Sequence, residues 1–515
     1  MVNLQRVSAG AGLGLVILVS FFLNLGGIPL FDLDEGAFSE ATREMFVRGD
    51  FMSTFLNGVP RHDKPILIYW LQAASVALFG INEFAFRLPS ALAATGWVLM
   101  IYYFVARLTD GRRALLAAVV TATCLEISVM GKAATADALL NFCITSAMLM
   151  YFLHYRFRRR RYHYLFFLFM GLGFLTKGPI AIIIPAVVTT LFALLRGEWA
   201  FWARTVFDPR AIALFAVVAL PWYIAQYFRD GGAFIKAFFF EHNVGRFDQA
   251  MESHRGNYFY YVPVVLLGVL PYTAAVLLVF KRFPQLLRDE LSLYLLLWFG
   301  FVFLLFSFSG TKLPHYVVYG FSALTILMAL NMDGLKRRWL SLLPVQLFLL
   351  ALLFLPQLLD YAQSSARDVY LREMLANHWQ VWPVSYFLWV VLALVAVGYL
   401  TFEKRLSLVA SLCLSGVITV ATFSSAVMPV VATLQQQPIK EAAQLARQQG
   451  LEVVQWHLRT PSFNVYSESI SPQREPRPGD YVLTKTKFLA DLPTPYETLY
   501  RKHGITLIYL RQTDT

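Results

Sequence analysis

Long apolar runs alternate with short polar segments over most of this chain. Each run approaches the roughly 20 residues that an α-helix needs to cross a bilayer, and each ends in charged or turn-forming residues. We place the runs at residues 8–30, 88–107, 113–130, 136–155, 162–176, 179–196, 211–228, 258–280, 291–308, 316–332, 339–358, 384–402 and 406–428. The pattern predicts an all-α polytopic membrane protein with about thirteen transmembrane helices.

The last part of the chain has a different pattern. The segment "PIKEAAQLARQQG" has helical spacing and ends at Gly450. The segments "LEVVQWHL", "DYVLTKTKF" and "ITLIYLRQ" read as strands separated by Pro and Gly turns. We therefore expect a membrane part over residues 1–430 and a small α/β domain over residues 435–515. A domain of this size buries only a modest core, so it should lean on the membrane part.

Composition agrees with a membrane location and charge adds an orientation. The chain is 57% hydrophobic and only 15% charged, too little charge to coat a soluble domain. Lysines and arginines gather in alternate short loops, which the positive-inside rule assigns to the cytoplasm together with the N-terminus. Residues 31–87, 229–257 and 359–383 form the longer loops of the opposite face. That outside face, periplasmic in a bacterium, should also carry the C-terminal domain.

The net charge of +12 does not indicate nucleic acid, because its excess lies in the cytoplasmic loops and suits anionic membrane lipids. All three cysteines fall inside apolar runs, so we expect no disulfide in the outside loops. The sequence has neither a P-loop nor a Gly-x-Gly-x-x-Gly motif, which argues against a soluble nucleotide as the donor.

The first outside loop, "FDLDEGAFSEATREMFVRGDF", carries Asp32, Asp34 and Glu35 within four residues. A helix cap needs only one carboxylate, and a charge in the membrane costs roughly 2.5–3.5 kcal/mol, so these groups should be paired or bound to something. The following residues predict an amphipathic helix on the membrane surface. A second, shorter apolar helix should run from about Pro65 to Phe79.

Other ionisable residues also lie beside the outside ends of the spans. They are Lys132, Asp137, Lys177, His242, Arg246, His254, Arg255, Lys312 and His315. Taken singly, each has a structural explanation as a helix cap, a snorkelling side chain or an exposed polar residue. Together on one face of a helix bundle they predict a cavity with both signs of charge. The cations suit a phosphate, and the carboxylates suit a base, a metal or a sugar.

An ordered set of segments resembles a known family. These segments are "DLDEGAFSEATREM", "RHDKPILIYW", "TKGP", "EHNVGRF", "HRGNYFYYVP" and "FSGTKLPHYV". The set is similar to the bacterial aminoarabinose transferases that decorate lipid A, which belong with the protein O-mannosyltransferases among glycosyltransferases of the GT-C fold. The resemblance implies a bacterial inner-membrane enzyme that takes a sugar from a polyprenyl (undecaprenyl) phosphate carrier. The acceptor would be reached at the periplasmic face.

The resemblance also implies site residues. Asp34 matches the catalytic acidic residue of the first loop, with Glu35 beside it, and Asp137 matches a second acidic position near the site. The residues that match donor-phosphate ligands or their neighbours are Lys64, Arg246, Lys177, Lys312, Asp63, His242 and Tyr316. The sequence requires no cofactor. A divalent metal held by Asp34, Asp63 and His242 is a further expectation, although no compact metal motif is present.

The chain departs from the family in the first loop. The aminoarabinose transferases usually read Asp-Glu-x-Arg-Tyr, whereas this chain has Ala37 and Phe38 in place of the Arg and Tyr. Asp63 stands where Glu is usual. Loss of a guanidinium and a phenol removes directional hydrogen bonds. The transferred sugar or the acceptor should therefore differ, and the acceptor stays open among lipid A, another lipopolysaccharide sugar and a protein hydroxyl.

The chemistry of such a transfer assigns roles to these groups. A single displacement at the anomeric carbon inverts its configuration, and Lys64 and Arg246 can stabilise the departing phosphate. Asp34 is the candidate general base for a hydroxyl acceptor, or orients an acceptor that is already an anionic phosphate. A transporter or lipid flippase is the alternative from another class. It is disfavoured because the ionisable residues crowd one surface instead of the bilayer midplane.

Overall fold

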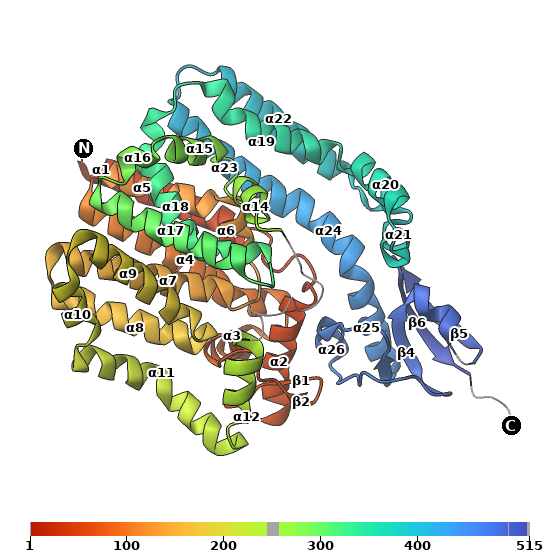
Figure 1. The fold of residues 1–515 in the computed structure, drawn as a ribbon. Coiled ribbons are helices and arrows are strands. Elements are labelled where there is room, and N and C mark those ends of the chain that lie inside the picture. Colours follow the sequence, from red (N-terminus) through yellow and green to blue (C-terminus); the bar gives the residue numbers. More distant parts are fainter. Residues whose placement is uncertain (1, 245–256, 493, 512–515) are drawn as a thin grey trace.

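The computed structural model describes residues 2–244, 257–492 and 494–511, with side chains from residue 10 to residue 240 in the first stretch. A bundle of helices forms most of the molecule, and a small sheet lies beyond one end of it (Figure 1). The expectation of a mostly helical polytopic membrane protein with a small C-terminal sheet is confirmed.

Each of the thirteen predicted apolar runs contains helix, but many of the helices are short or broken. Seven segments are long and apolar enough to cross a membrane, and the bent pair α19 (Arg338–Leu353) and α20 (Leu355–Ser365) makes up to eight. Five of the seven are α4 (Glu83–Leu108), α7 (Asp137–Phe157), α11 (Pro209–Asp230), α17 (Glu290–Phe308) and α22 (Val384–Phe402). The sixth, Pro314–Gly334, consists of η4 (Pro314–Gly320), α18 (Phe321–Asn331) and η5 (Met332–Gly334). The seventh, Leu408–Gln435, consists of α23 (Leu408–Thr422), η7 (Phe423–Val427) and α24 (Met428–Gln435). The number of thirteen complete crossings is not confirmed.

The remaining runs fall short for local reasons. The run at 258–280 is two helices, α14 (Tyr261–Gly268) and α15 (Thr273–Lys281), separated around Pro271, which has no backbone N–H to continue a helix. The run at 113–130 is divided at Cys124, whose backbone is extended. The other short elements of the bundle are α1 (Val2–Ile17), η1 (Leu18–Phe22), α5 (Gly111–Thr123), α6 (Leu125–Met130), α8 (Arg160–Lys177), α9 (Ile180–Arg196), α10 (Trp199–Val206), α12 (Ala233–Ile235), η2 (Lys236–Val244) and α16 (Phe283–Leu286).

Both helices predicted in the first outside loop are present, as α2 (Asp34–Arg48) and α3 (Leu67–Phe79). Between them, the predicted turn at Asn57-Gly58 joins β1 (Phe55–Leu56) to β2 (Val59–Pro60), and both turn residues have positive φ as such hairpins require. However, α2 does not lie on an open surface. Its residues from Glu35 to Met45 are all buried. Charged groups of this buried stretch pair with each other inside the protein, as Glu40 and Arg43 do at 2.7 Å.

The C-terminal part is a four-stranded mixed sheet with order β3-β4-β6-β5. The predicted strands correspond to β3 (Val453–Gln455), β4 (Tyr481–Lys485) and β6 (Ile505–Leu510), while β5 (Tyr496–Lys502) was not predicted. The predicted helix is α25 (Gln437–Gln449), capped by Gly450 with φ of 64°. It packs its Ala-rich face on the sheet. The shorter elements here are α21 (Val369–Leu375), η6 (His378–Val381), α26 (Pro461–Ser467) and η8 (Thr486–Asp491).

The sheet is attached to the first outside loop through α26. The Ser462 backbone N–H donates to Asp32 at 3.0 Å, and the Tyr466 hydroxyl accepts from the Leu30 N–H at 2.7 Å. Helix α24 leads into α25 with only Gln436 between them, so the predicted division near residue 435 falls at a helix junction. The division into domains 1–430 and 435–515 stays a prediction.

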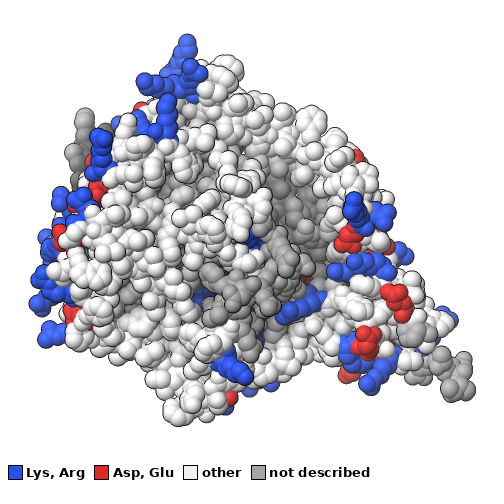
Figure 2. Space-filling view, in the orientation of Figure 1, with Lys and Arg blue, Asp and Glu red and all other residues white. Residues whose placement is uncertain are grey.

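Charge is distributed unevenly over the visible face. Lysines and arginines gather over the left edge, near the ends of α1, α9 and α10, and over the upper edge, near the ends of α19 and α22 (Figures 1 and 2). Charges of both signs are mixed around the C-terminal sheet. A broad surface with little charge lies between them. This arrangement suits a molecule whose middle faces lipid.

Candidate functional site

Asp34, the predicted catalytic carboxylate, is the first residue of α2 and is exposed. The helix has no side-chain cap at this end, so capping does not explain the carboxylate. Among the residues that the structure describes, no hydrogen bond or ion pair engages the Asp34 side chain. Within that part of the chain, the Asp34 carboxylate is available to a ligand.

Glu35, by contrast, is fully engaged. Its carboxylate accepts from the Arg87 guanidinium at 2.8 and 2.7 Å, and from the backbone N–H groups of Phe31 and Ala134. Burial alone would raise the pKa of Glu35, but the Arg87 charge and these hydrogen bonds hold it below its ordinary value. These contacts support a positioning role, and its assignment as a second catalytic acid stays a prediction.

Asp63 and Lys64 lie together in the segment before α3. The Lys64 ammonium donates to the Asp63 carboxylate at 2.7 Å, and the Arg61 guanidinium donates to the other carboxylate oxygen at 3.2 Å. The side chain of Lys64 is only 10% exposed, so water has little access to its ammonium group. The assignment of Asp63 and Lys64 to a phosphate-binding element stays a prediction.

Arg61 was missed by the sequence analysis. Its side chain is only 9% exposed, and within the described residues its Nε and Nη1 atoms are buried without a hydrogen-bond acceptor. The guanidinium lies 5.1 Å from the ring centroid of Phe38. The buried Tyr69 stacks on the same ring, and its hydroxyl likewise has no hydrogen-bond partner among the described residues. Burial lowers the pKa of Arg61, but the Tyr69, Asp63 and Asp34 charges raise it overall.

The contacts of Arg61 and Tyr69 with Phe38 concern the positions, Ala37 and Phe38, at which the first loop differs from the resembling family. The chain lacks the Arg and Tyr that the family usually carries in the first loop, yet Arg61 and Tyr69 bring a guanidinium and a phenol onto the Phe38 ring. The sequence signal was the Arg61 of "RHDKP", directly before the acidic-Lys-Pro element.

A second cluster unites Asp137, Lys177 and Tyr316 from three separate elements. Asp137 begins α7 and Lys177 ends α8, and their charged atoms are 2.6 Å apart. The Tyr319 hydroxyl donates to Asp137 at 2.8 Å, and the Lys177 ammonium is 5.9 Å from the Tyr316 ring centroid. The structure thus brings these three predicted residues together and adds Tyr319.

His315 connects the two clusters. Its half-buried imidazole interacts electrostatically with Asp137 and Lys177 of the bundle and with Asp34 and Lys64 of the first loop. The sequence analysis noted this histidine among the ionisable residues at span ends but gave it no role. These four groups, two from each cluster, are therefore within electrostatic range of a single imidazole.

Lys312 has a different environment. Its ammonium donates to the carbonyl oxygens of Ser307 and Ser309 at 2.9 and 2.8 Å, at the end of α17. A cation is favourable at a helix C-terminus, which is a structural role. Its assignment as a phosphate ligand stays a prediction.

Two of the predicted residues lie wholly or partly outside the described part of the chain. Arg246 and the side chain of His242 lie outside the described residues. In the part of the chain that is described, no group of three His, Cys, Asp or Glu residues could hold a metal ion. Asp63 is already paired with two cations, so a metal there would have to displace them. The metal site of Asp34, Asp63 and His242 stays a prediction.

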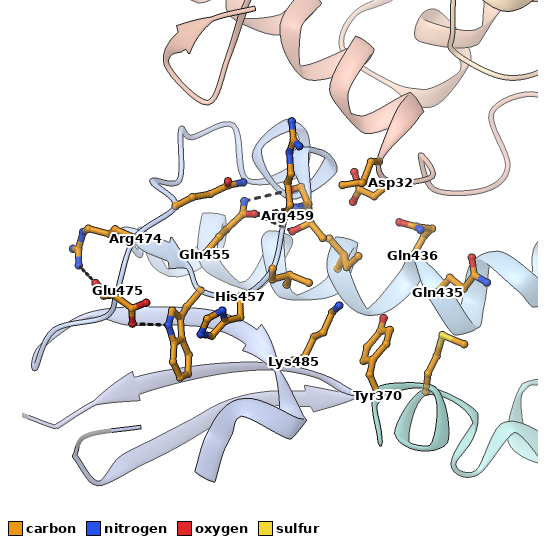
Figure 3. A pocket seen from close by; sticks show the side chains of 17 residues that line it. Asp32, Tyr370, Gln435, Gln436, Gln455, His457, Arg459, Arg474, Glu475 and Lys485 are labelled. Carbon is orange, nitrogen blue, oxygen red and sulfur yellow. Dashed lines mark hydrogen bonds between the residues drawn. The ribbon is translucent and has the colours of Figure 1, made fainter. Parts of the chain in front are cut away.

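Two cavities lie beside the start of α2. One, of about 240 Å³, is lined by Asp34, Glu35, Arg87 and Lys132 among apolar residues. Burial lowers the pKa of the Lys132 ammonium to about 7. The other, of about 840 Å³, opens between the first loop and the C-terminal sheet (Figure 3). Asp32 lines both cavities.

The chain is similar to known proteins in sequence. Residues 63–224 match the family described as dolichyl-phosphate-mannose-protein mannosyltransferase. The undecaprenyl phosphate-alpha-4-amino-4-deoxy-L-arabinose arabinosyl transferase of Aeromonas hydrophila is 32% identical over 331 residues, which cover 63% of this chain and 60% of that protein. Its namesake from Photorhabdus laumondii is 28% identical over 422 residues, covering 78% and 73%. The chain spans about 60% of the length of the first curated relatives that it matches.

The fold is also shared. ArnT from Cupriavidus metallidurans bound to undecaprenyl phosphate superposes with a TM-score of 0.81 at 20% identity, over 99% of this chain and 98% of that one. The apo state of the same protein gives a TM-score of 0.80. These findings confirm the resemblance drawn from the sequence and the multi-pass membrane architecture.

Proposed function

Because this chain is an ArnT-like protein in sequence and fold, we propose that it is a membrane glycosyltransferase that uses an undecaprenyl-phosphate-linked sugar as its donor. The observation that carries the proposal is that the carboxylate of Asp34 and the ammonium groups of Lys64 and Lys177 all lie within electrostatic range of the His315 imidazole. Transfer from a lipid phosphate requires these two kinds of group.

The donor phosphate would bind to the cations. Lys64, Lys177 and Arg246 are the ligands that we assign to it, with Tyr316 beside them. The Cupriavidus protein of the same fold was crystallised with undecaprenyl phosphate, which supports this donor class. As the anomeric bond breaks, charge builds on the phosphate oxygen, and fixed ammonium groups lower the energy of that state.

Asp34 would act on the acceptor. For a hydroxyl acceptor it removes the proton as the oxygen attacks the anomeric carbon from the side opposite the departing phosphate, which inverts the configuration. Glu35, held by Arg87, fixes the first turn of α2 and thereby directs Asp34 outward. For an anionic acceptor, Asp34 orients the nucleophile instead.

We assign the acceptor to lipid A or another lipopolysaccharide component. The Aeromonas and Photorhabdus relatives, at 32% and 28% identity, are named as arabinosyl transferases, which supports a pentose as the transferred sugar. A protein hydroxyl is the second candidate acceptor, and the match of residues 63–224 to the mannosyltransferase family favours it. Transport stays the weakest alternative.

The site would face the periplasm of a bacterial inner membrane. The basic edge in Figure 2 is the cytoplasmic side under the positive-inside rule, and the C-terminal sheet lies away from it. Asp34 and α26 are on the sheet side, because the Ser462 N–H bonds to Asp32, two residues before Asp34.

The test is transfer from a radiolabelled undecaprenyl-phosphate sugar by the full chain in membranes. Asp34→Asn and Lys64→Ala should each lower the rate by about 100-fold or more, since each removes a group that acts on the transition state. The matched control is Asp333→Asn, an exposed carboxylate of η5. Wild-type rates in both site variants, with normal expression, would refute the assignment.

A further inference from the structure

The cavity of about 840 Å³ lies where three parts of the chain meet. Asp32 and Leu33 come from the first loop, Tyr370 from α21, and Gln436 from the junction of α24 and α25. The opposite wall is the C-terminal sheet and the segment after β3. Figure 3 shows Lys485 extending from the sheet and Tyr370 extending from α21, both toward Gln436 and Asp32. Its volume is that of a typical small-molecule site.

One wall residue lacks a partner. Gln436 is 6% exposed, and its Oε1 atom is buried with no hydrogen-bond donor among the described residues. A buried acceptor left unsatisfied is unfavourable, and native proteins contain few of them. Because Gln436 lines the cavity, a ligand hydroxyl or amine can supply the missing donor.

The charged groups of the cavity divide into engaged and available ones. The Arg474 guanidinium is paired with Asp480 at 2.7 Å, and Glu475 accepts from the Trp456 indole at 2.8 Å. Arg459 is exposed and has no ion-pair partner in the described part of the chain. Lys485 is half-buried and lies 4.6 Å from the Tyr370 ring centroid. The available charges are thus cationic and suit an anion.

The remaining wall suits a sugar. Gln435 and Gln473 provide amide groups that both donate and accept, which matches the hydroxyls of a saccharide. Trp456 and His457 add aromatic faces with polar edges. Amides, aromatic faces and unpaired cations together match a sugar that carries an anionic substituent.

The cavity adjoins the proposed reaction site through a shared residue. Asp32 lines both cavities and is held by the Ser462 backbone N–H and hydroxyl. Asp34 follows two residues later, so the two α-carbons are at most about 7 Å apart. A headgroup in the larger cavity would therefore bring its reacting atom to the edge of the Asp34 pocket.

We propose that this cavity binds the phosphorylated sugar headgroup of the acceptor glycolipid, with Arg459 and Lys485 on its phosphate and Gln436 on a sugar hydroxyl or amine. The inference rests on the proposed transferase function and names its acceptor class. Much of the cavity is built by the C-terminal part, so this part would select the acceptor while the membrane part holds the donor.

The first test is direct binding to the full chain in detergent, using a water-soluble bisphosphorylated glucosamine disaccharide as the probe. Arg459→Gln should weaken binding by about tenfold, the effect of losing one charge-assisted hydrogen bond. Gln436→Leu should weaken binding of both the phosphorylated probe and the same disaccharide without phosphate. The control is Arg501→Gln, an exposed arginine of β5 that does not line the cavity.

Several outcomes separate the possibilities. Equal binding by wild type and Arg459→Gln would overturn the proposal, as would competition by an acceptor peptide in place of the phosphosugar. Arg459 is exposed, so its variant should fold even if Gln436→Leu does not.

The second test separates this cavity from the transfer chemistry. In the transfer assay, Arg459→Gln should raise the acceptor KM by about tenfold and leave the donor KM unchanged. Asp34→Asn should abolish transfer yet still bind the disaccharide probe. If Asp34→Asn loses transfer but the acceptor KM of Arg459→Gln is unchanged, only the assignment of the cavity is refuted. If the wild-type protein binds the probe but shows no transfer, only the proposed function is refuted.

Discussion

The Glu35 carboxylate and the Arg87 guanidinium form a buried two-point ion pair, with distances of 2.8 and 2.7 Å, between the first turn of α2 and helix α4. The other guanidinium hydrogens donate to the carbonyl oxygens of Leu25, Ile28 and Pro29. One arginine thereby ties the end of the first apolar run to α2, and Asp34 stands directly before the fixed carboxylate.

Breaking this pair should destabilise the protein. Arg87→Leu leaves the Glu35 carboxylate buried without its counter-charge, which costs about 3–5 kcal/mol. The double variant Glu35→Leu/Arg87→Leu should recover part of that loss, because no charge is stranded. Thermal unfolding of both proteins in detergent measures the difference. A double variant less stable than Arg87→Leu would contradict this account.

Replacing Arg61 should lower activity without lowering stability. Arg61→Met removes two buried nitrogens without acceptors, so the free energy of unfolding should change by less than about 1 kcal/mol or increase. Transfer should nevertheless fall by about tenfold if the guanidinium meets the substrate, as one charge-assisted hydrogen bond implies. Rates and thermal midpoints for Arg61→Met and Arg48→Met, an exposed arginine at the end of α2, test this. A large loss of stability would show that Arg61 is structural.

The two tyrosines near Lys177 should behave differently. Tyr319→Phe removes hydrogen bonds to both Asp137 and Lys177, so it should lower stability by about 1 kcal/mol. The Tyr316 ring lies beside Lys177, so Tyr316→Phe should leave stability unchanged and lower transfer only through a lost contact with the donor. Unfolding and donor KM, measured together, distinguish the two roles. Equal stability losses in both variants would argue against a substrate contact for Tyr316.

Asp32 should make stability depend on pH. Burial raises its pKa to about 7, above its ordinary value of 3.8, despite the opposing hydrogen bonds from Ser462. A raised pKa stabilises the fold at low pH, and that contribution is lost as pH rises through about 7. Asp32→Asn lacks this titration, so its stability relative to wild type should increase between about pH 5 and pH 8, by roughly 1–2 kcal/mol after allowance for partial exposure. Thermal midpoints of both proteins at the two pH values measure it. A constant difference would contradict the raised pKa.

The sequence by itself determined the features that arise from local patterns. Apolar runs predicted helices because every backbone group must be satisfied inside a bilayer, and the adjacency of Asp63 and Lys64 already placed an acid beside a cation. Alternating residues predicted β3, β4 and β6. Strand β5 was missed because its exposed edge lacks an apolar alternation.

Only the tertiary structure decided which distant groups meet. Spacing along the chain cannot show that Glu35 is matched by Arg87, that Asp137 pairs with Lys177, or that His315 lies between two clusters. Nor could it show the burial of α2, because a helix with charges on several faces reads as a surface helix until its partners are known. The physical reason is that ion pairs and cavities depend on distances in space, which the packing of separate helices fixes.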